Sequence, residues 1–127
     1  GKRGLSQRVV FHGYVEDSRA IVARADAALC SSRSEGLGLA LLEAMSMARP
    51  VVGFAVGGVP EIVRDNATGL LSRAGDVAAL AARMREACES RDRLRELGEA
   101  ARKHVIERFS AHAMRSRYAD VYASLVS

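Results

Sequence analysis

The chain has 127 residues, which is enough for one domain around a single hydrophobic core. Hydrophobic residues make up 49% of the sequence but aromatic residues only 5%, so Ala, Val and Leu must fill most of that core, as is typical of α/β proteins. The net charge is +4, yet most arginines stand among acids without interleaved aromatics, which argues against a nucleic-acid-binding face. No apolar run is long enough to cross a bilayer and residues 1–6 lack the apolar core of a signal peptide, so we expect a cytoplasmic protein, with peripheral contact to an anionic membrane surface as an alternative.

The first part of the chain predicts two strands and a short helix. Residues 8–12 have the apolar character of a strand. Asp17 or Ser18 can cap a short helix that continues to Arg24. Residues 26–31 then predict a second strand.

The middle of the chain also predicts helices and strands in alternation. Residues 39–48 predict a helix, which Pro50 stops. Residues 51–54 form a continuous apolar run, which is typical of a strand in a parallel sheet. Residues 57–63 predict a second glycine turn followed by a short helix, and residues 69–71 predict a fourth strand.

From Asp76 onward the pattern is helical to the end of the chain. Three apolar stripes recur at helical spacing: Val77, Leu80, Ala81, Met84 and Cys88; Leu94, Leu97, Ala101 and Val105; Met114, Tyr118, Val121 and Leu125. Ser110 is suited to cap the last helix. Strands and helices in this order predict a Rossmann-like parallel sheet with flanking helices, whose ligands bind beyond the carboxyl ends of the strands.

The first glycine turn is the most informative segment, because a buried strand breaks there and the chain continues as a helix. Gly36 and Gly38 permit a tight turn, and the amides of Gly38, Leu39 and Ala40 then point outward without helical partners. Such amides lie at the positive end of the helix dipole, which favours a phosphate or a sugar oxygen above them.

Two carboxylates flank this turn. Glu35 and Glu43 would repel a bare phosphate, but a carboxylate accepts hydrogen bonds well from a pair of sugar hydroxyls. We therefore expect a ligand in which a sugar is joined to a phosphate. The alternative is structural, because glycine-rich turns occur throughout α/β proteins and early helical glutamates often only complement the dipole.

Several segments together resemble the retaining GT-B glycosyltransferases of the large group 1 family. The resemblance extends from about Val9 to the last helix, and Glu35 and Glu43 form that family's Glu-x7-Glu signature. The segments that carry it are residues 32–39, 43–45, 50–52, 57–63 and 68–71. The resemblance implies the C-terminal, donor-binding half of a hexosyltransferase-like enzyme that uses a UDP-, GDP- or ADP-sugar, retains anomeric configuration and needs no metal ion or other cofactor.

The resemblance also implies roles for individual residues. Glu35 would lie at the donor sugar as the catalytic-site acid, and Glu43 would hold the ribose hydroxyls. Backbone amides would face the sugar and phosphate at Gly36, Leu37, Gly38 and Leu39. The candidate base and donor loops are Gly13, Tyr14 and Val15, which are similar to the family's base-flanking loop, and Gly57 and Gly58.

Two positions depart from the family's usual pattern. Leu37 stands where members usually carry Phe, which is conservative for packing. Ala48 stands where they usually carry Gly. The alanine is destabilising only if the helix ends in a residue with a left-handed conformation.

In the family, the basic pair that neutralises the diphosphate lies upstream of this region, and the acceptor-binding half precedes that. We therefore expect residues 1–127 to be one partial, N-terminally truncated donor domain that is inactive without the missing N-terminal half of the enzyme and acts on an acceptor we cannot name. Lys2, Arg3 and Arg8 are weak substitutes for the basic pair. An unpaired sheet edge would favour self-association. The alternative function is a non-catalytic nucleotide or nucleotide-sugar binding module.

The remaining candidates are interpreted as structural. Cys30 and Cys88 are expected to be reduced thiols without metal-ligand neighbours. Glu61 is read as a helix-start acid, with a contact to the donor as the alternative. The three histidines, which lack an oriented partner, are His12, His104 and His112.

Overall fold

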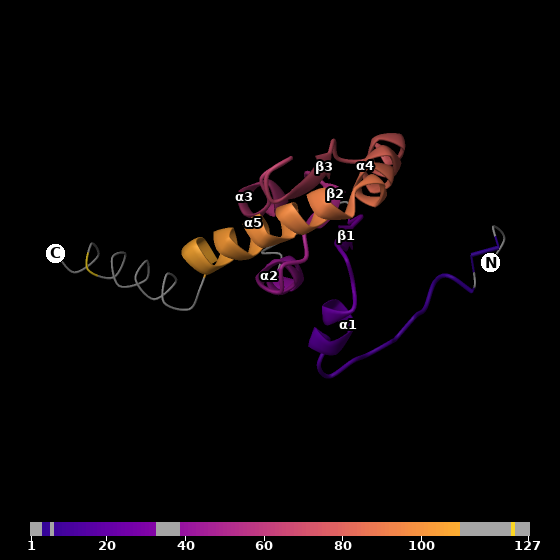
Figure 1. The fold of residues 1–127 in the computed structure, drawn as a ribbon, viewed down its shortest axis with the longest axis horizontal. Coiled ribbons are helices and arrows are strands. Elements are labelled where there is room, and N and C mark those ends of the chain that lie inside the picture. The colour runs from indigo at the N-terminus through magenta and orange to yellow at the C-terminus, as the bar shows by residue number, and fades with distance from the viewer. Residues whose placement is uncertain (1–3, 6, 33–38, 110–122, 124–127) are drawn as a thin grey trace.

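The computed structural model describes residues 4–5, 7–32, 39–109 and 123. Its elements follow one another in the order α1 (Arg19–Ala23), β1 (Ala28–Cys30), α2 (Leu39–Ser46), β2 (Val51–Phe54), α3 (Val59–Ile62), β3 (Gly69–Ser72), α4 (Val77–Glu89) and α5 (Arg91–Phe109). In the described part of the chain the strands form a three-stranded parallel sheet in the order β1-β2-β3 (Figure 1). The predicted Rossmann-like fold class is therefore confirmed.

The register of the sheet aligns the ends of the strands. Ala28 lies opposite Val51 in the first pair, and Val51 lies opposite Gly69 in the second. The parallel strands are joined by crossovers through α2 and α3, as such pairs require. All three strands therefore end at one edge of the sheet.

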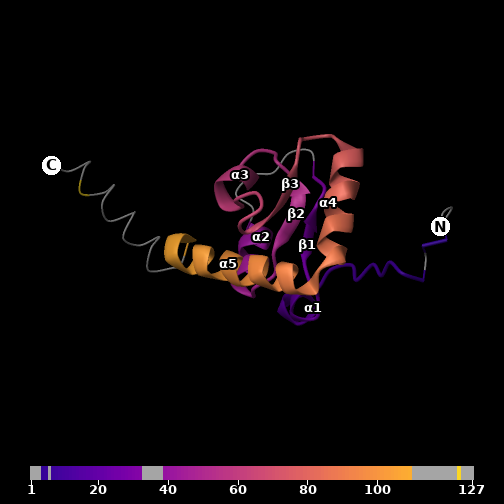
Figure 2. The same ribbon diagram turned by 45° about the horizontal axis from the view of Figure 1, so that its top comes forward.

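Helices cover the sheet from both sides. Figure 2 shows α2 and α3 on one side of the strands, α4 on the other, and α5 crossing near the ends where the strands begin. β2 is buried along its whole length, because it is the central strand and has helices on both faces. The same hydrophobic core contains Met45, Leu70 and Val59, whose side chains are fully buried.

The helices α2 and α5 approach each other closely where α2 ends. Gly98 of α5 lies so near the backbone of Ala48 that a Cβ added at Gly98 would be 2.1 Å from the Ala48 carbonyl oxygen. Ala48 itself has a φ of 61°, a left-handed conformation that favours glycine. The helix therefore ends in a left-handed residue at the position where group 1 members usually carry Gly.

The structure contradicts the predicted first strand over residues 8–12. This segment has no strand conformation, and Val10 and Phe11 are 71% and 92% exposed. A strand needs a neighbour for its backbone N–H and C=O groups, and no described strand pairs with this segment. The apolar pattern was read correctly, but the pairing that would make it a strand is absent from the described residues.

The other predicted boundaries differ by a few residues. The helix predicted over residues 39–48 ends at Ser46, and the strand predicted over residues 26–31 spans only Ala28–Cys30. The continuous helical pattern after Asp76 is interrupted at Ser90, which is extended and separates α4 from α5. The third apolar stripe falls on residues 114–125, and like Ser110 it lies outside the described residues.

Along the described residues, β1 forms one edge of the sheet. Leu29 of this strand is 53% exposed. Self-association through this edge stays a prediction. In the part of the chain that the structure describes, no helix is both long enough and apolar enough to span a membrane.

Candidate functional site

The candidate site lies where the strands end, and the structure describes part of it. The first glycine turn, with Glu35, Gly36, Leu37 and Gly38, lies outside the described residues, so their predicted roles are not tested. Leu39 is the first residue of α2. The start of α2 thus follows β1 at the carboxyl edge of the sheet, where open α/β sheets bind ligands.

Glu43 lies on α2, one turn after Leu39, and is half-buried. Its Cβ tilts toward the amino end of the helix, as in every α-helix, and so toward the same edge of the sheet. Its carboxylate oxygen Oε1 accepts a hydrogen bond of 3.1 Å from the hydroxyl of Ser18. The predicted ribose-binding acid is therefore held by a residue 25 positions earlier in the chain.

The second glycine turn follows β2 at the same edge. Gly57 has a φ of 49°, which favours glycine, and Gly58 occupies the N-cap position of α3 without a side chain to cap it. Glu61 is an exposed acid in the first turn of α3, as predicted. The topology therefore brings the starts of α2 and α3 to one edge, as the sequence predicted for the two glycine turns.

The predicted base-flanking loop precedes α1. Gly13 has a φ of 64°, Tyr14 is 94% exposed, and Val15 is half-buried. The ring of Tyr14 is therefore available to solvent in this structure. The hydrogen bond from Ser18 to Glu43 connects the segment after this loop to α2.

A hollow marks the carboxyl edge of the sheet. It has a volume of about 590 Å³ and is bounded by residues that follow or end the three described strands. These residues are Ser31, Phe54, Ala74, Gly75, Val77 and Leu80. The edge that the topology assigns to a ligand is thus open and mostly apolar.

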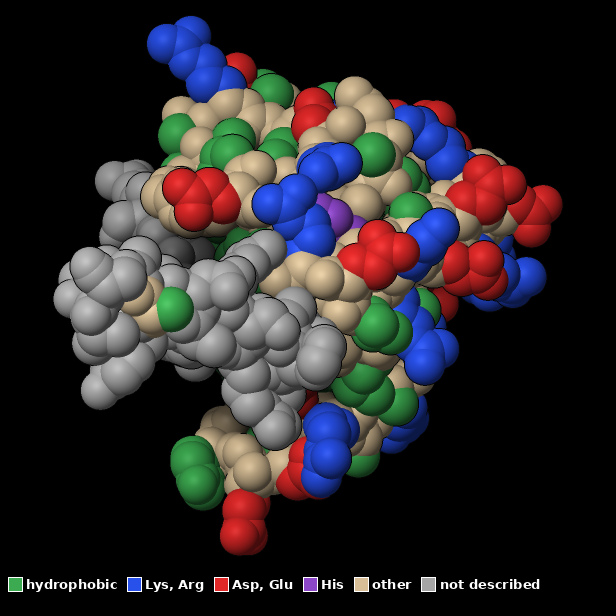
Figure 3. All heavy atoms as spheres, turned by 90° about the vertical axis from the view of Figure 1, so that its left-hand side faces the viewer, with side chains coloured by type: hydrophobic (Ala, Val, Ile, Leu, Met, Phe, Trp, Pro, Cys, Tyr) green, Lys and Arg blue, Asp and Glu red, His purple; other side chains and the backbone are tan. Residues whose placement is uncertain are grey.

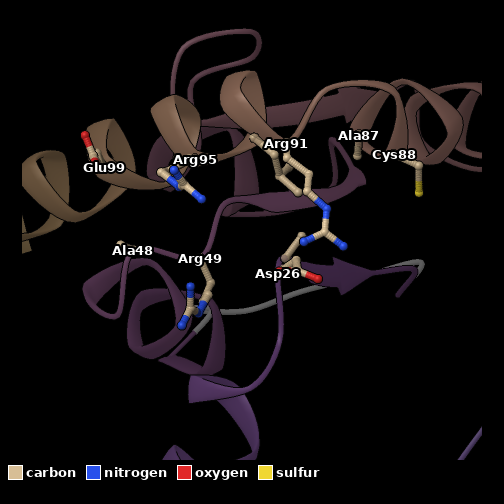
Figure 4. Close-up of a pocket in the computed structure, with 10 residues that line it drawn as sticks. Asp26, Ala48, Arg49, Ala87, Cys88, Arg91, Arg95 and Glu99 are labelled. Carbon is tan, nitrogen blue, oxygen red and sulfur yellow. The ribbon is translucent and has the colours of Figure 1, made fainter.

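A second hollow, of about 430 Å³, lies at the opposite edge, where the strands begin (Figure 4). Its charged lining is mixed in sign and comes from the starts of β1 and β2 and from α5. The charged residues are Asp26, Arg49, Arg91, Arg95 and Glu99. Because ligands of open parallel sheets bind at the carboxyl ends of the strands, we do not place the donor here.

His104 of α5 is buried, and its imidazole ring packs against Phe109. Burial lowers the pKa of its imidazole, and the nearby guanidinium groups of Arg64 and Arg108 lower the pKa further. A hydrogen bond with the Ile62 backbone and the negative charge of Glu107 act in the opposite direction. Its ring packs edge-on against Phe109 with 5.8 Å between ring centroids, and its Nε2 has no hydrogen-bond partner. The prediction of a structural histidine is consistent with this packing between α3 and α5.

The other reactive side chains do not gather at the site. Cys30 is buried in β1, whereas Cys88 is exposed on α4, and the two form no disulfide. His12 is exposed in the segment before α1. Among the described residues, no group of three or more His, Cys, Asp and Glu side chains could hold a metal ion. Figure 3 shows basic and acidic side chains interspersed over the face that it presents.

The parallel sheet and the helices on both of its faces define a Rossmann-like α/β domain, with a hollow at the carboxyl edge of the sheet. The family model described as "Glycosyl transferases group 1" matches residues 1–104, and the chain belongs to this family. The resemblance predicted from the sequence is therefore confirmed.

The chain is similar to proteins of known activity and structure. It is 34% identical over 118 residues to the N-acetyl-alpha-D-glucosaminyl L-malate synthase of Bacillus anthracis, covering 93% of this chain and 31% of that relative. It superposes with a TM-score of 0.87 and 27% identity on Alr3699/HepE of Anabaena in complex with UDP-glucose, covering 97% of this chain and 34% of that one.

A third similarity locates the match within such proteins. The C-terminal domain of a group 1 family protein (LpcC) of Francisella tularensis matches with a TM-score of 0.76 and 25% identity, over 87% of this chain and 58% of that one. The chain spans about a third of the length of the curated relatives it matches. The fold is thus that of the C-terminal half of a GT-B glycosyltransferase.

Proposed function

We propose that this chain is the donor-binding part of a glycosyltransferase that transfers a hexosyl group from a nucleotide-sugar to an acceptor with retention of configuration. One observation carries the proposal: in a chain of the group 1 family, α2 and α3 both begin after strands at the carboxyl edge of the sheet, and a hollow lined in part by α4 lies at this edge. The complex of Alr3699/HepE with UDP-glucose supports a UDP-sugar before the GDP- and ADP-sugars as the donor.

In this proposal, the chemistry needs positive potential at the departing diphosphate more than it needs a strong nucleophile. The glycosidic carbon develops oxocarbenium character as the nucleoside diphosphate leaves, and helix-start amides stabilise the charge on the diphosphate. Basic residues of the kind that the family carries upstream supply the remaining positive charge, without a metal ion.

The two acids of the signature have separate roles in the proposal. Glu35 accepts hydrogen bonds from the donor sugar and orients it for reaction. Glu43 accepts hydrogen bonds from the ribose hydroxyls, which its position on α2 near the carboxyl edge supports. Gly57 and Gly58 present backbone amides to the donor, and residues 13–15 flank the base.

The test uses the native protein in its full length with UDP-glucose, UDP-N-acetylglucosamine, and GDP- and ADP-glucose. Binding is measured by calorimetry and turnover by release of the nucleoside diphosphate with and without sugar acceptors. Glu35→Ala should lower turnover by about 10²-fold with bound donor, and Glu43→Ala should weaken donor binding by about 10-fold or more. Glu99→Ala, an exposed acid at the opposite edge, is the matched control and should change neither quantity.

Three outcomes would contradict the proposal. Binding of no nucleotide-sugar would remove the donor site altogether. Binding without turnover for any donor and acceptor would favour a non-catalytic nucleotide-sugar binding module. Equal loss of affinity in both variants, with turnover of bound donor intact, would overturn the division of roles between Glu35 and Glu43.

A further inference from the structure

Ser18 occupies the N-cap position of α1 but does not cap it. A serine before a helix usually accepts a hydrogen bond from a backbone amide of the first turn. In this structure no such bond forms, and the hydroxyl instead donates to Oε1 of Glu43 on α2. Of the two predicted caps, Asp17 or Ser18, Ser18 therefore does not serve, and its hydroxyl makes a long-range contact instead.

Asp17 takes over the local role at this end of α1. Its Oδ1 accepts a hydrogen bond of 3.0 Å from the backbone N–H of Arg19. The Arg19 guanidinium donates two more hydrogen bonds to the same carboxylate, at 3.0 Å and 2.9 Å. These bonds lower the pKa of Asp17 to about 2, so the carboxylate stays charged near neutral pH. The Ser18 hydroxyl is thus left for Glu43.

The other end of α1 is held by Arg49, which lies just before β2. Its Nε donates to the carbonyl oxygen of Val22 at 3.3 Å, and one terminal nitrogen donates to that of Ala23 at 2.7 Å. These carbonyls belong to the last turn of α1, and that of Val22 also accepts a hydrogen bond of 3.0 Å from the backbone N–H of Ala25. Because α1 has five residues and none of them is buried, such polar contacts fix its place relative to α2.

We propose that Ser18 is a positioning residue for Glu43 and so contributes to recognition of the ribose of the donor. This inference rests on the proposed function, in which Glu43 binds the ribose hydroxyls. A glutamate on a helix samples several rotamers, and ordering them on binding costs affinity. The Ser18 hydroxyl selects one rotamer before the donor arrives and thereby lowers that cost.

The geometry leaves Glu43 able to bind a ligand at the same time. A carboxylate has about four acceptor positions, and Ser18 uses one of them on Oε1. Both oxygens can therefore still accept a hydrogen bond, one from each of two neighbouring ribose hydroxyls. A carboxylate fixed in this way discriminates between ribose and 2′-deoxyribose better than one that can rotate away.

The test measures the dissociation constants of UDP and 2′-deoxy-UDP by calorimetry on the full-length native protein. Ser18→Ala should weaken UDP binding by about 3- to 10-fold and should lower the ratio of the two constants. Ser18→Thr keeps the hydroxyl and should restore most of the affinity. Because Ser18 makes no capping bond, the thermal unfolding temperature of Ser18→Ala should equal that of the parent.

Ser46 provides a matched control on α2. Its hydroxyl donates at 2.6 Å to the backbone carbonyl of Glu43 and leaves the carboxylate alone. Ser46→Ala therefore removes the same group from a neighbour of Glu43 and should leave both dissociation constants unchanged. An equal loss of affinity in Ser46→Ala and Ser18→Ala would overturn the inference.

Glu43→Gln separates failure of the inference from failure of the proposed function. If Glu43→Gln leaves UDP affinity unchanged, Glu43 binds no ribose and the proposed role of Glu43 fails. If Glu43→Gln weakens UDP binding but Ser18→Ala does not, Glu43 binds ribose without help from Ser18 and the inference is overturned. If Ser18→Ala has no further effect in the Glu43→Gln protein, the two residues act together as proposed.

Discussion

Two regions of the molecule are held in place by different forces. The first is the region around β2, α2 and α5, and the second is the segment that precedes β1. In the first region β2 is buried along its length, and α5 meets the end of α2 at Gly98. In the second, α1 has no buried residue and is attached by hydrogen bonds from Ser18 and Arg49. Substitutions in the first region should therefore change global stability, and substitutions in the second should change local order.

Gly98→Ala should have the largest effect on stability. In an exposed helix this change stabilises by about 1 kcal/mol, because alanine is the better helix former. Here the new Cβ would lie 2.1 Å from the carbonyl oxygen of Ala48, so α5 must move away from α2. We expect a loss of about 3 kcal/mol in the free energy of unfolding, measured by urea denaturation.

The control for this prediction is Glu99→Ala on the next residue of α5. Glu99 is exposed, so its substitution should change the free energy of unfolding by less than about 0.5 kcal/mol. A stabilised Gly98→Ala protein would mean that helix propensity outweighs the contact between α2 and α5.

Ala48→Gly should have the next largest effect, in the opposite direction. Ala48 has a φ of 61°, and a left-handed conformation costs a residue with a Cβ about 1 kcal/mol. Glycine removes this cost, although it also raises the entropy of the unfolded chain. We expect a net gain of about 0.5 kcal/mol in the free energy of unfolding.

Asn66 is the matched comparison for Ala48, because its φ is 65°. Asparagine tolerates the left-handed region, and the Asn66 side-chain oxygen accepts a hydrogen bond of 2.8 Å from Arg83. Asn66→Gly should therefore destabilise the protein. A gain at Asn66 as large as that at Ala48 would show that backbone strain alone decides both substitutions.

The same two regions show what the sequence can predict. The strand Val51–Phe54 was predicted at its observed bounds, because a run of apolar residues buried on both faces is a local signal. Residues 8–12 also contain an apolar run, Val9 to Phe11, but they form no strand and Phe11 is 92% exposed, because pairing depends on a neighbour that the local pattern does not specify. An apolar run therefore predicts a buried strand only where the fold supplies a neighbour that pairs with it.

Some features of the candidate site could also be predicted from the sequence, and others could not. The structure confirms the predicted order of strands and helices, which places the starts of α2 and α3 at one edge, whereas the first glycine turn lies outside the described residues. The contact between Ser18 and Glu43 could not be predicted, because a serine before a helix equally indicates a cap and its partner is 25 residues away. The role of Glu35 stays a prediction, since it lies outside the described residues.

The titration of His104 should make the free energy of unfolding depend on pH, with a smaller effect than the substitutions above. Its pKa is lower in the folded protein than in the unfolded chain, where it is about 6.5, so below pH 6.5 the unfolded chain binds more protons. The free energy of unfolding should therefore fall as the pH is lowered from 7.5 to 5.5. His104→Gln, which keeps a side-chain N–H donor but does not titrate, should show a shallower decline, and an unchanged slope would contradict the assignment of the decline to His104.

Arg49→Met should have the smallest effect on global stability and a clear effect on α1. The substitution removes the donors to the carbonyls of Val22 and Ala23, but it leaves the core around β2 intact, so the free energy of unfolding should change by less than about 0.5 kcal/mol. The backbone amides of Arg24 and Ala25, which close the last turn of α1, should exchange with solvent several-fold faster.

Arg95→Met is the control for Arg49→Met, because Arg95 lines the same hollow from α5 (Figure 4). It removes an equal charge from the same hollow without removing a donor to the Val22 or Ala23 carbonyls, so the exchange of Arg24 and Ala25 should not change. Equal acceleration in both variants would mean that the charge at this edge, and not the two hydrogen bonds, holds α1. Acceleration confined to Arg49→Met would show that its two hydrogen bonds hold the last turn of α1, a helix in which Ile21 and Val22 are only half-buried and which therefore depends on polar contacts more than the core does.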